Sequence, residues 1–160
     1  MSAKARDATS EPPRVGGSYL LILRVETPAA CVIGRLGEVR LESGDYIYSG
    51  SALQSGGLRA RLLRHARPLT RRHWHVDHLR TVATVMGAWY RADGQRHEHA
   101  WAYALAALCP VPVPRFGASD CRCPAHLFRA PDADGPNCAA TVAAAAGSGP
   151  PPLTWWPAPA

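Results

Sequence analysis

Two tyrosines, an arginine and a histidine are the residues of this chain best suited to chemistry on a phosphate ester. Tyr19 ends a Gly-Ser-Tyr triplet, and Tyr48 begins a Tyr-Ser-Gly triplet. Arg61 and His65 stand four residues apart in a segment with helical spacing, so one helix face, opposite the leucines, presents a guanidinium and an imidazole together. A guanidinium can bind a phosphate through two parallel hydrogen bonds. Phosphodiester hydrolysis needs an activated water and stabilisation of the charge on the phosphoryl oxygens. The alternative for each residue taken singly is a core-facing strand tyrosine or a solvated arginine.

Glu98 is the candidate for holding a divalent cation. It is the only carboxylate in a segment with helical spacing, and it continues the apolar stripe formed by Trp101, Leu105 and Leu108. Mg²⁺ or Mn²⁺ needs only one or two carboxylates when substrate phosphate and water complete its shell. The alternative is a negative charge placed favourably in the first turn of a helix. The sequence leaves both interpretations open.

A group of soft metal ligands follows later in the chain. Cys121, Cys123 and His126 lie within six residues, close enough to chelate one structural zinc ion with a fourth ligand from Cys109 or Cys138. One alternative is a set of buried free thiols. Another is that this segment lines a cleft with the polar side chains of Ser119, Asp120 and His126.

Positive charge is concentrated in the middle of the chain. The formal net charge is +6, the isoelectric point is about 9.4, and 17 of the 18 basic residues are arginines. No acidic residue lies between Asp45 and Asp77, so this stretch predicts a surface patch for polyanions. We expect DNA, or alternatively RNA, to contact Arg59, Arg64, Arg67, Arg71, Arg72 and His75. His75 and His78, on either side of Asp77, are further candidates for proton transfer, although rim histidines are the alternative.

The segments around these residues alternate between strand and helix patterns. Strands are predicted at residues 18–25, 39–41, 45–49 and 85–90, the second and third joined by a turn at 42–44. Helices are predicted at residues 58–67, about 73–82 and about 95–108. Two or three antiparallel strands flanked by helices make an α/β domain of the α+β kind, with a small, mainly antiparallel sheet.

Length and composition favour one domain. A chain of 160 residues can bury one core without disulfides. Composition predicts a disordered tail at residues 1–16, the folded domain at 17–130 and a low-complexity tail rich in Ala and Pro at 131–160. The five cysteines, an odd number without regular spacing, favour reduced thiols, and no apolar run is long enough to span a bilayer. We therefore expect a cytoplasmic protein that does not contact membranes.

Three separate stretches resemble the GIY-YIG nuclease superfamily, in the right order and over about residues 17–128. The two tyrosine triplets with Arg61 and His65 resemble its motifs, with serine at both positions where the name motif has isoleucine. Residues 73–77 and 116–128 resemble a branch of small stand-alone proteins, some of which are fused to endonuclease-III-like repair enzymes.

This resemblance implies a GIY-YIG-like fold and a metal-dependent endonuclease that hydrolyses phosphodiester bonds in DNA, with a role in DNA repair and a repair protein as partner. It implies that Glu98 holds Mg²⁺ or Mn²⁺ and that the catalytic residues are Tyr19, Tyr48, Arg61, His65 and Glu98. One alternative is a non-catalytic DNA- or RNA-binding module that keeps the nuclease fold. A second is a small zinc-stabilised domain that binds proteins.

Overall fold

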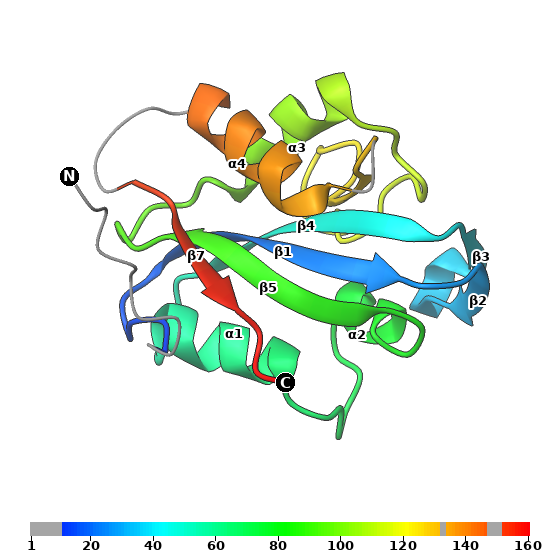
Figure 1. The fold of residues 1–160 in the computed structure, drawn as a ribbon, viewed down its shortest axis with the longest axis horizontal. Helices are drawn as coiled ribbons and strands as arrows, with labels where there is room; N and C mark the ends of the chain where they lie inside the picture. Colours follow the sequence, from blue (N-terminus) through cyan, green and yellow to red (C-terminus); the bar gives the residue numbers. More distant parts are fainter. Residues whose placement is uncertain (1–10, 132–133, 147–151) are drawn as a thin grey trace.

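A five-stranded antiparallel sheet forms the centre of the molecule. The computed structural model describes residues 11–131, 134–146 and 152–160. The strand order is β6-β4-β1-β5-β7, so β1 is the central strand (Figure 1). The bounds of these strands are β1 Gly17–Val25, β4 Gly44–Ala52, β5 Thr84–Arg91, β6 Leu127–Arg129 and β7 Thr154–Pro157.

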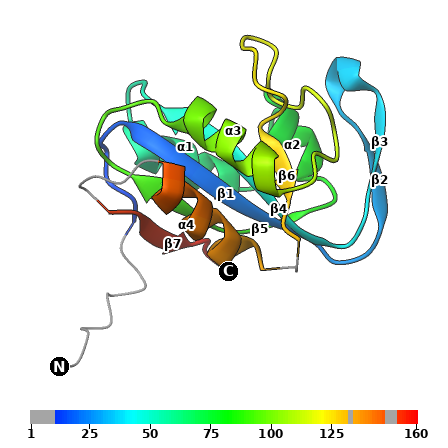
Figure 2. The same ribbon diagram turned by 90° about the horizontal axis from the view of Figure 1, so that it is seen from above.

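Helices cover both faces of this sheet. In Figure 1, α1 (Gly57–Ala66) and α2 (His75–Leu79) lie below it, and α3 (Glu98–Leu108) and α4 (Gly135–Ala146) lie above it. A separate hairpin of β2 (Ala29–Val32) and β3 (Glu38–Leu41) extends from one end, as Figure 2 shows from above; its turn contains the short helix η1 (Gly34–Leu36). The fold is therefore α+β, with the small antiparallel sheet flanked by helices that the sequence predicts.

The two faces of β1 explain its central place. Tyr19, Leu21 and Leu23 belong to the core under α1 and α2, whereas Leu20 and Ile22 belong to the core under α3 and α4. A strand covered on both faces needs a continuous apolar run. Successive residues of β1 thus point alternately into two hydrophobic cores, one on each face of the sheet.

The two helices on the α1 side are short for identifiable reasons. α1 ends at Ala66 because Arg67 is extended and precedes Pro68, whose ring disfavours a helical residue before it. α2 begins where the Asp77 carboxylate accepts hydrogen bonds from the backbone N–H groups of His73 and Trp74, 2.7 and 2.9 Å away. The helix predicted at about 73–82 is therefore reduced to five residues.

The prediction of a low-complexity tail at residues 131–160 is wrong for the described part of that segment. The alanine-rich residues form α4, which packs its buried Ala139 and Ala143 in the core shared with α3. β7 pairs antiparallel with β5, and Trp156 is buried against Ala88 in that pairing. The physical reason is that the free edge of β5 and the apolar face of α3 offer partners to a segment with little patterning of its own.

The predicted disordered tail at residues 1–16 lies in part outside the described residues, which begin at 11. Residues 11–16 contact the start of α1, where the carbonyls of Val15 and Pro13 accept hydrogen bonds from the N–H groups of Leu58 and Arg59, each at 3.0 Å. These residues are therefore part of the folded domain and not a tail.

Two strand pairings also differ from the sequence prediction. β3 pairs with β2 and not with the following β4, and β2 itself was not predicted. β6 is a three-residue strand that also escaped prediction because it is too short to show alternation. No described helix is both long enough and apolar enough to cross a membrane.

Candidate functional site

Tyr19 and His65 form the buried centre of the candidate site. The Tyr19 hydroxyl lies 2.8 Å from Nε2 of His65, and both side chains are almost completely inaccessible to solvent. His65 therefore shares the buried face of α1 with Leu58 and Leu62 and does not lie opposite them, which corrects the helical projection. β1 supplies the phenol and α1 supplies the imidazole.

Both motif glycines are required by close approaches of the backbone. Gly50 pairs across the strands with Tyr19, and a Cβ at Gly50 would lie 2.5 Å from Cζ of the Tyr19 ring. A Cβ at Gly17 would lie 2.0 Å from the carbonyl oxygen of Arg91 on β5. The glycines of the two triplets therefore allow β1 to lie close to both of its neighbours, β4 and β5.

Burial controls the protonation of this pair. Burial raises the pKa of Tyr19 to about 12, and the positive charge of Arg61 opposes part of that rise. Burial also lowers the pKa of His65 to about 3, with Arg61 acting in the same direction. Near neutral pH the imidazole is therefore uncharged and the phenol keeps its proton.

The hydrogen bonds of His65 indicate which nitrogen carries its proton. Nδ1 of His65 is buried and has no hydrogen-bond partner among the described residues. A buried N–H without an acceptor is rarer in proteins than a buried acceptor without a donor. We therefore assign the proton to Nε2, which donates a hydrogen bond to the Tyr19 oxygen and leaves the phenolic O–H free to turn.

Tyr48 lies on the same face, beside this pair. Its ring centroid is 6.5 Å from that of Tyr19, 6.4 Å from that of His65 and 6.1 Å from that of Phe116. Burial raises the pKa of Tyr48 well above its ordinary value, and the charge of Glu98 adds to that rise. The second tyrosine is thus a neutral phenol at the same end of the sheet.

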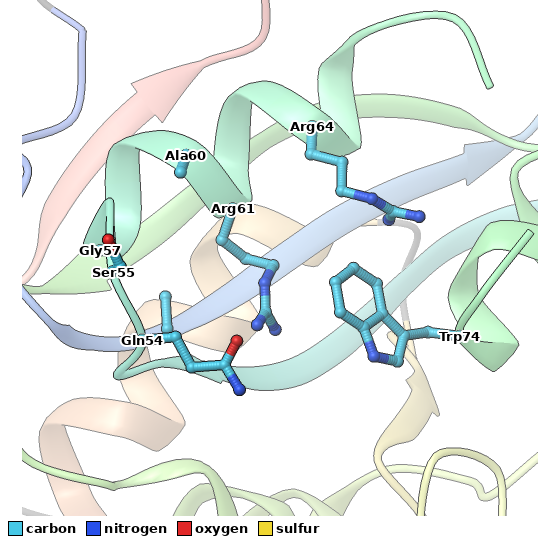
Figure 3. Close-up of a pocket in the computed structure, with 8 residues that line it drawn as sticks. Gln54, Ser55, Gly57, Ala60, Arg61, Arg64 and Trp74 are labelled. Atoms are coloured by element: carbon cyan, nitrogen blue, oxygen red, sulfur yellow. The ribbon is translucent and has the colours of Figure 1, made fainter. Parts of the chain in front are cut away.

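Arg61 borders a cavity at the surface next to the tyrosines. Its Nη1 donates to the carbonyl of Ser51 at 3.0 Å, and its Cζ lies 4.3 Å from the centroid of the Trp74 ring. The cavity measures about 160 Å³ and is lined by Arg61, Arg64, Trp74, Gln54 and Ser55, with smaller residues (Figure 3). A solvent-facing guanidinium with a flat aromatic neighbour suits an anionic group attached to a ring.

The two motif serines act on the opposite face of the sheet. The Ser49 hydroxyl donates to the carbonyl of Glu98 at 2.7 Å. The Ser18 oxygen accepts from the N–H of His97 at 2.7 Å and donates to the carbonyl of Gln95 at 3.0 Å. Ser18 and Ser49 therefore tie the start of α3 to the two strands that carry the tyrosines.

Glu98 is consequently held at the N-terminus of α3, with a side chain that is only 14% exposed. Its carboxylate forms an ion pair with Arg96 and lies 3.9 Å from Nδ1 of His126. Its charge contributes to the raised pKa of both Tyr19 and Tyr48. The structure thus brings the five predicted catalytic residues to one end of the β1–β4 pair, with Tyr19, Tyr48, Arg61 and His65 on the side of α1 and Glu98 on α3, which covers the opposite face.

The predicted nucleic-acid contacts divide into two groups. Three of them already have partners: Arg59 pairs with Glu11, Arg64 pairs with the buried Asp77, and Nδ1 of His75 accepts from the N–H of Gly117 at 2.7 Å. Asp77, which lies between the two histidines considered for proton transfer, holds Arg64 and the start of α2. The other three predicted contacts are exposed: Arg67, Arg71 and Arg72.

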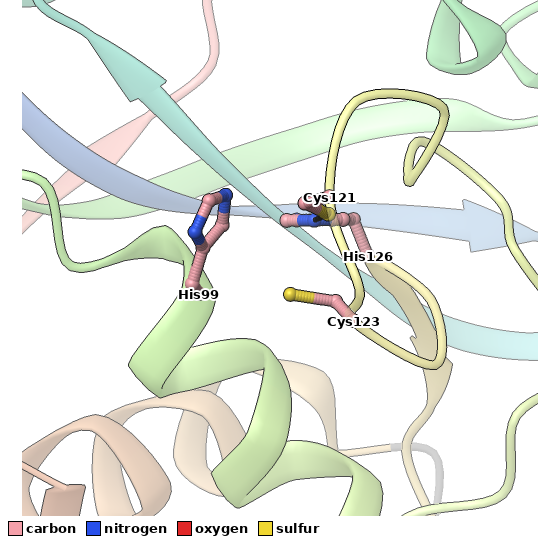
Figure 4. Close-up of side chains that lie close together, drawn as sticks. All are labelled: His99, Cys121, Cys123 and His126. Carbon is pink, nitrogen blue, oxygen red and sulfur yellow. Dashed lines mark hydrogen bonds between the residues drawn. The ribbon is translucent and has the colours of Figure 1, made fainter.

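The soft ligands predicted near the end of the domain gather with a residue that the sequence did not indicate. The ligand atoms of Cys121, Cys123, His126 and His99 all lie within 4.8 Å of one another (Figure 4). Cys109 and Cys138, predicted as alternative fourth ligands, lie with their sulfurs 3.6 Å apart between α3 and α4. No spacing rule links His99 to the cysteines, because it lies on α3, 22 residues before Cys121.

The fold and this site define an α+β domain with a tyrosine–histidine–arginine centre. Residues 18–147 match the family described as "Domain of unknown function DUF123". The chain therefore belongs to that family, whose domain extends through α4. No curated protein and no solved structure matches the chain.

Proposed function

We propose that this protein is a metal-dependent endonuclease of the GIY-YIG type that hydrolyses phosphodiester bonds in DNA. The observation that carries the proposal is the 2.8 Å contact between the buried imidazole of His65 and the hydroxyl of Tyr19, next to the guanidinium of Arg61. Tyr48 and Glu98 complete the set at the same end of the sheet. These five residues are the ones that the resemblance to this superfamily indicates.

Tyr19 would act as the general base in its phenolate form: its own proton first leaves to solvent, and the phenolate oxygen then accepts a proton from the attacking water. Its oxygen receives a hydrogen bond from N–H of His65, and the nearby positive charge of Arg61 also favours the phenolate. Both interactions grow stronger as negative charge develops on the oxygen, which is the property required of a general base. Tyr48 would orient the water from the neighbouring strand.

Arg61 would bind the scissile phosphate. A guanidinium has five N–H donors, so the hydrogen bonds to Ser51 and Tyr19 leave donors for two phosphoryl oxygens. The Trp74 ring lies 4.3 Å from the guanidinium carbon of Arg61 and 4.2 Å from that of Arg64, so it holds two cationic groups beside the cavity. The cavity that these two residues share is therefore the proposed place of the reacting nucleotide.

Glu98 would hold Mg²⁺ or Mn²⁺ together with water and phosphate oxygens. The hydrogen bond from Ser49 to the main-chain carbonyl of Glu98 holds this residue at the start of α3. Its carboxylate pairs with the exposed Arg96 and lies 3.8 Å from Nε2 of His99 and 3.9 Å from Nδ1 of His126, so a cation would replace the contact with Arg96. When bound, such an ion stabilises negative charge on the phosphoryl oxygens.

DNA is the proposed partner, with RNA as the alternative polyanion, and a DNA-repair protein is a further proposed partner. The exposed arginines 67, 71 and 72 extend the positive surface beyond the cavity. Their contacts with phosphates release counterions, so affinity is expected to fall steeply as salt increases. We place this activity in the cytoplasm, where the free cysteines remain reduced.

The test is cleavage of labelled linear and branched DNA with Mg²⁺, with Mn²⁺ and with chelator, in the wild type and in Tyr19→Phe and Arg61→Ala. We expect metal-dependent cleavage to fall by about 10²–10⁴-fold in Tyr19→Phe while DNA binding is kept. Tyr103→Phe is the matched control, because Tyr103 is an exposed tyrosine on α3.

Each outcome distinguishes the proposed functions. Cleavage that both variants lose and the control keeps supports the nuclease. Salt-sensitive binding without cleavage in any metal would replace it with the non-catalytic nucleic-acid-binding module. Absence of both binding and cleavage would overturn both proposals.

A further inference from the structure

Four soft ligand atoms converge beside Glu98 from two distant parts of the chain. His99 lies in the first turn of α3, whereas Cys121, Cys123 and His126 belong to the loop before β6, called here the Cys loop (residues 121–126). Figure 4 shows the four side chains pointing toward a common centre. Sγ of Cys121 and Nε2 of His126 are 3.2 Å apart.

This geometry fits a single tetrahedral ion. Zinc bonds of about 2.3 Å to sulfur and about 2.0–2.1 Å to nitrogen place the ligand atoms of a tetrahedron about 3.4–3.8 Å apart. All four atoms here lie within 4.8 Å of one another, so small side-chain rotations are sufficient to bind the ion. Two thiolates and two neutral imidazoles also balance the charge of Zn²⁺, which limits the cost of placing it among partly buried groups.

The surroundings of the ligands are already arranged for this role. Nδ1 of His126 lies 3.1 Å from the carbonyl of Ser49, to which it can donate, leaving Nε2 unprotonated toward the sulfur atoms. The Arg115 guanidinium donates to the carbonyls of Cys121 and Cys123, each at 2.8 Å, and so fixes the path of the Cys loop. His126 and Cys123 are buried, which protects the site from water.

We propose that His99, Cys121, Cys123 and His126 bind one structural Zn²⁺ ion. Four protein ligands fill the tetrahedral shell and leave no position for a reacting water, so the ion is structural and not catalytic. It joins the first turn of α3 to the Cys loop and, through His126, to Ser49 on β4.

A consequence for the candidate site rests on the proposed nuclease function. Glu98 directly precedes His99, and its carbonyl accepts from Ser49, whose own carbonyl faces His126. The zinc ion therefore positions Glu98 through the neighbouring residue, because its ligand His99 directly follows Glu98 in the chain. The metal site itself does not depend on the nuclease function, and its test does not measure cleavage.

The test is elemental analysis of the full-length protein, purified from zinc-containing medium without a metal-affinity tag. We expect about one zinc ion per chain in the wild type and a loss of that ion in His99→Ala and in Cys121→Ser. Cys138→Ser is the matched control, because its thiol pairs with Cys109 and not with the cluster, and it should keep the full zinc content.

A second variant keeps the proposal testable if the first two do not fold. His99→Cys replaces one ligand by another, so it should retain one ion and, with Co²⁺ in place of Zn²⁺, show a stronger thiolate-to-cobalt absorption than the wild type. Removing the ion with a chelator should also accelerate amide exchange in the first turn of α3.

Wild-type protein without zinc would overturn the proposal, as would a full zinc content in both His99→Ala and Cys121→Ser. Loss of the ion in Cys138→Ser with retention in His99→Ala would instead move the fourth ligand to Cys138. Iron in place of zinc would overturn the assignment of the metal.

Discussion

Asp77 provides a quantitative test of how the region next to Arg61 is held together. Its carboxylate is completely buried, accepts two hydrogen bonds from Arg64 at 2.9 Å and two from the backbone N–H groups of His73 and Trp74. Burial by itself would raise the pKa of this carboxyl, but the four hydrogen bonds outweigh it and lower the pKa from 3.8 to about 2.

The stability that follows from this shift can be worked out with its sign. A depression of this size corresponds to about 2 kcal/mol of folding free energy. Because the pKa is lower in the folded state, the stabilisation is fully present above about pH 4 and is lost as the pH falls toward about 2. About half of it remains near pH 3.

The assay is urea unfolding of wild-type protein and Asp77→Asn at pH 7 and at pH 3. The variant keeps the shape of the side chain but cannot carry its charge, so we expect a deficit of about 2 kcal/mol at pH 7 that shrinks to about 1 kcal/mol at pH 3. Asp120→Asn is the control, because Asp120 is exposed and should leave the unfolding free energy unchanged at both pH values. An equal deficit at pH 7 and pH 3 would refute the reasoning, since the charge would then not be its source.

Two further variants test the packing of the sheet. Gly50→Ala places a Cβ 2.5 Å from the Tyr19 ring, so we expect a loss of about 1–3 kcal/mol in urea unfolding; unchanged stability would contradict the close contact across β1 and β4. Trp156→Ala removes the buried side chain of β7 and should cost about 3–5 kcal/mol, whereas the same change at Thr154, which is only partly buried, should cost much less. Equal effects at the two positions would argue against the docking of β7 on β5.

The sequence predicts those parts of the fold that carry a strong local pattern. Alternation in residues 18–25 locates β1, the strand-forming residue types at 85–90 locate β5, and the leucines of residues 58–67 locate α1. The same patterns place Tyr19 on β1 and Arg61 on α1. These elements are recognisable because their burial depends on their own side chains.

The parts that the sequence does not predict depend on partners that only folding provides. The alanines of α4 have no distinct apolar stripe and become a core element because α3 lies beside them. His99 has no sequence relation to the Cys loop, and it joins the cluster only because α3 crosses the end of β4. The sequence pattern also does not indicate the roles of Ser18 and Ser49, because each of them hydrogen-bonds to main-chain atoms of a segment far away in the chain.

The adjacent positions of Tyr48 and Ser49 place a constraint on how this domain can change. Successive strand residues point to opposite faces, so one residue directs its ring toward His65 while the next holds α3 and Glu98 on the other side. A single inserted or deleted residue in β4 would exchange the two faces and lose both functions in one step. We therefore expect the length of β4 to be fixed, whereas the β2–β3 hairpin, which pairs with no strand of the main sheet, does not set the register of either residue.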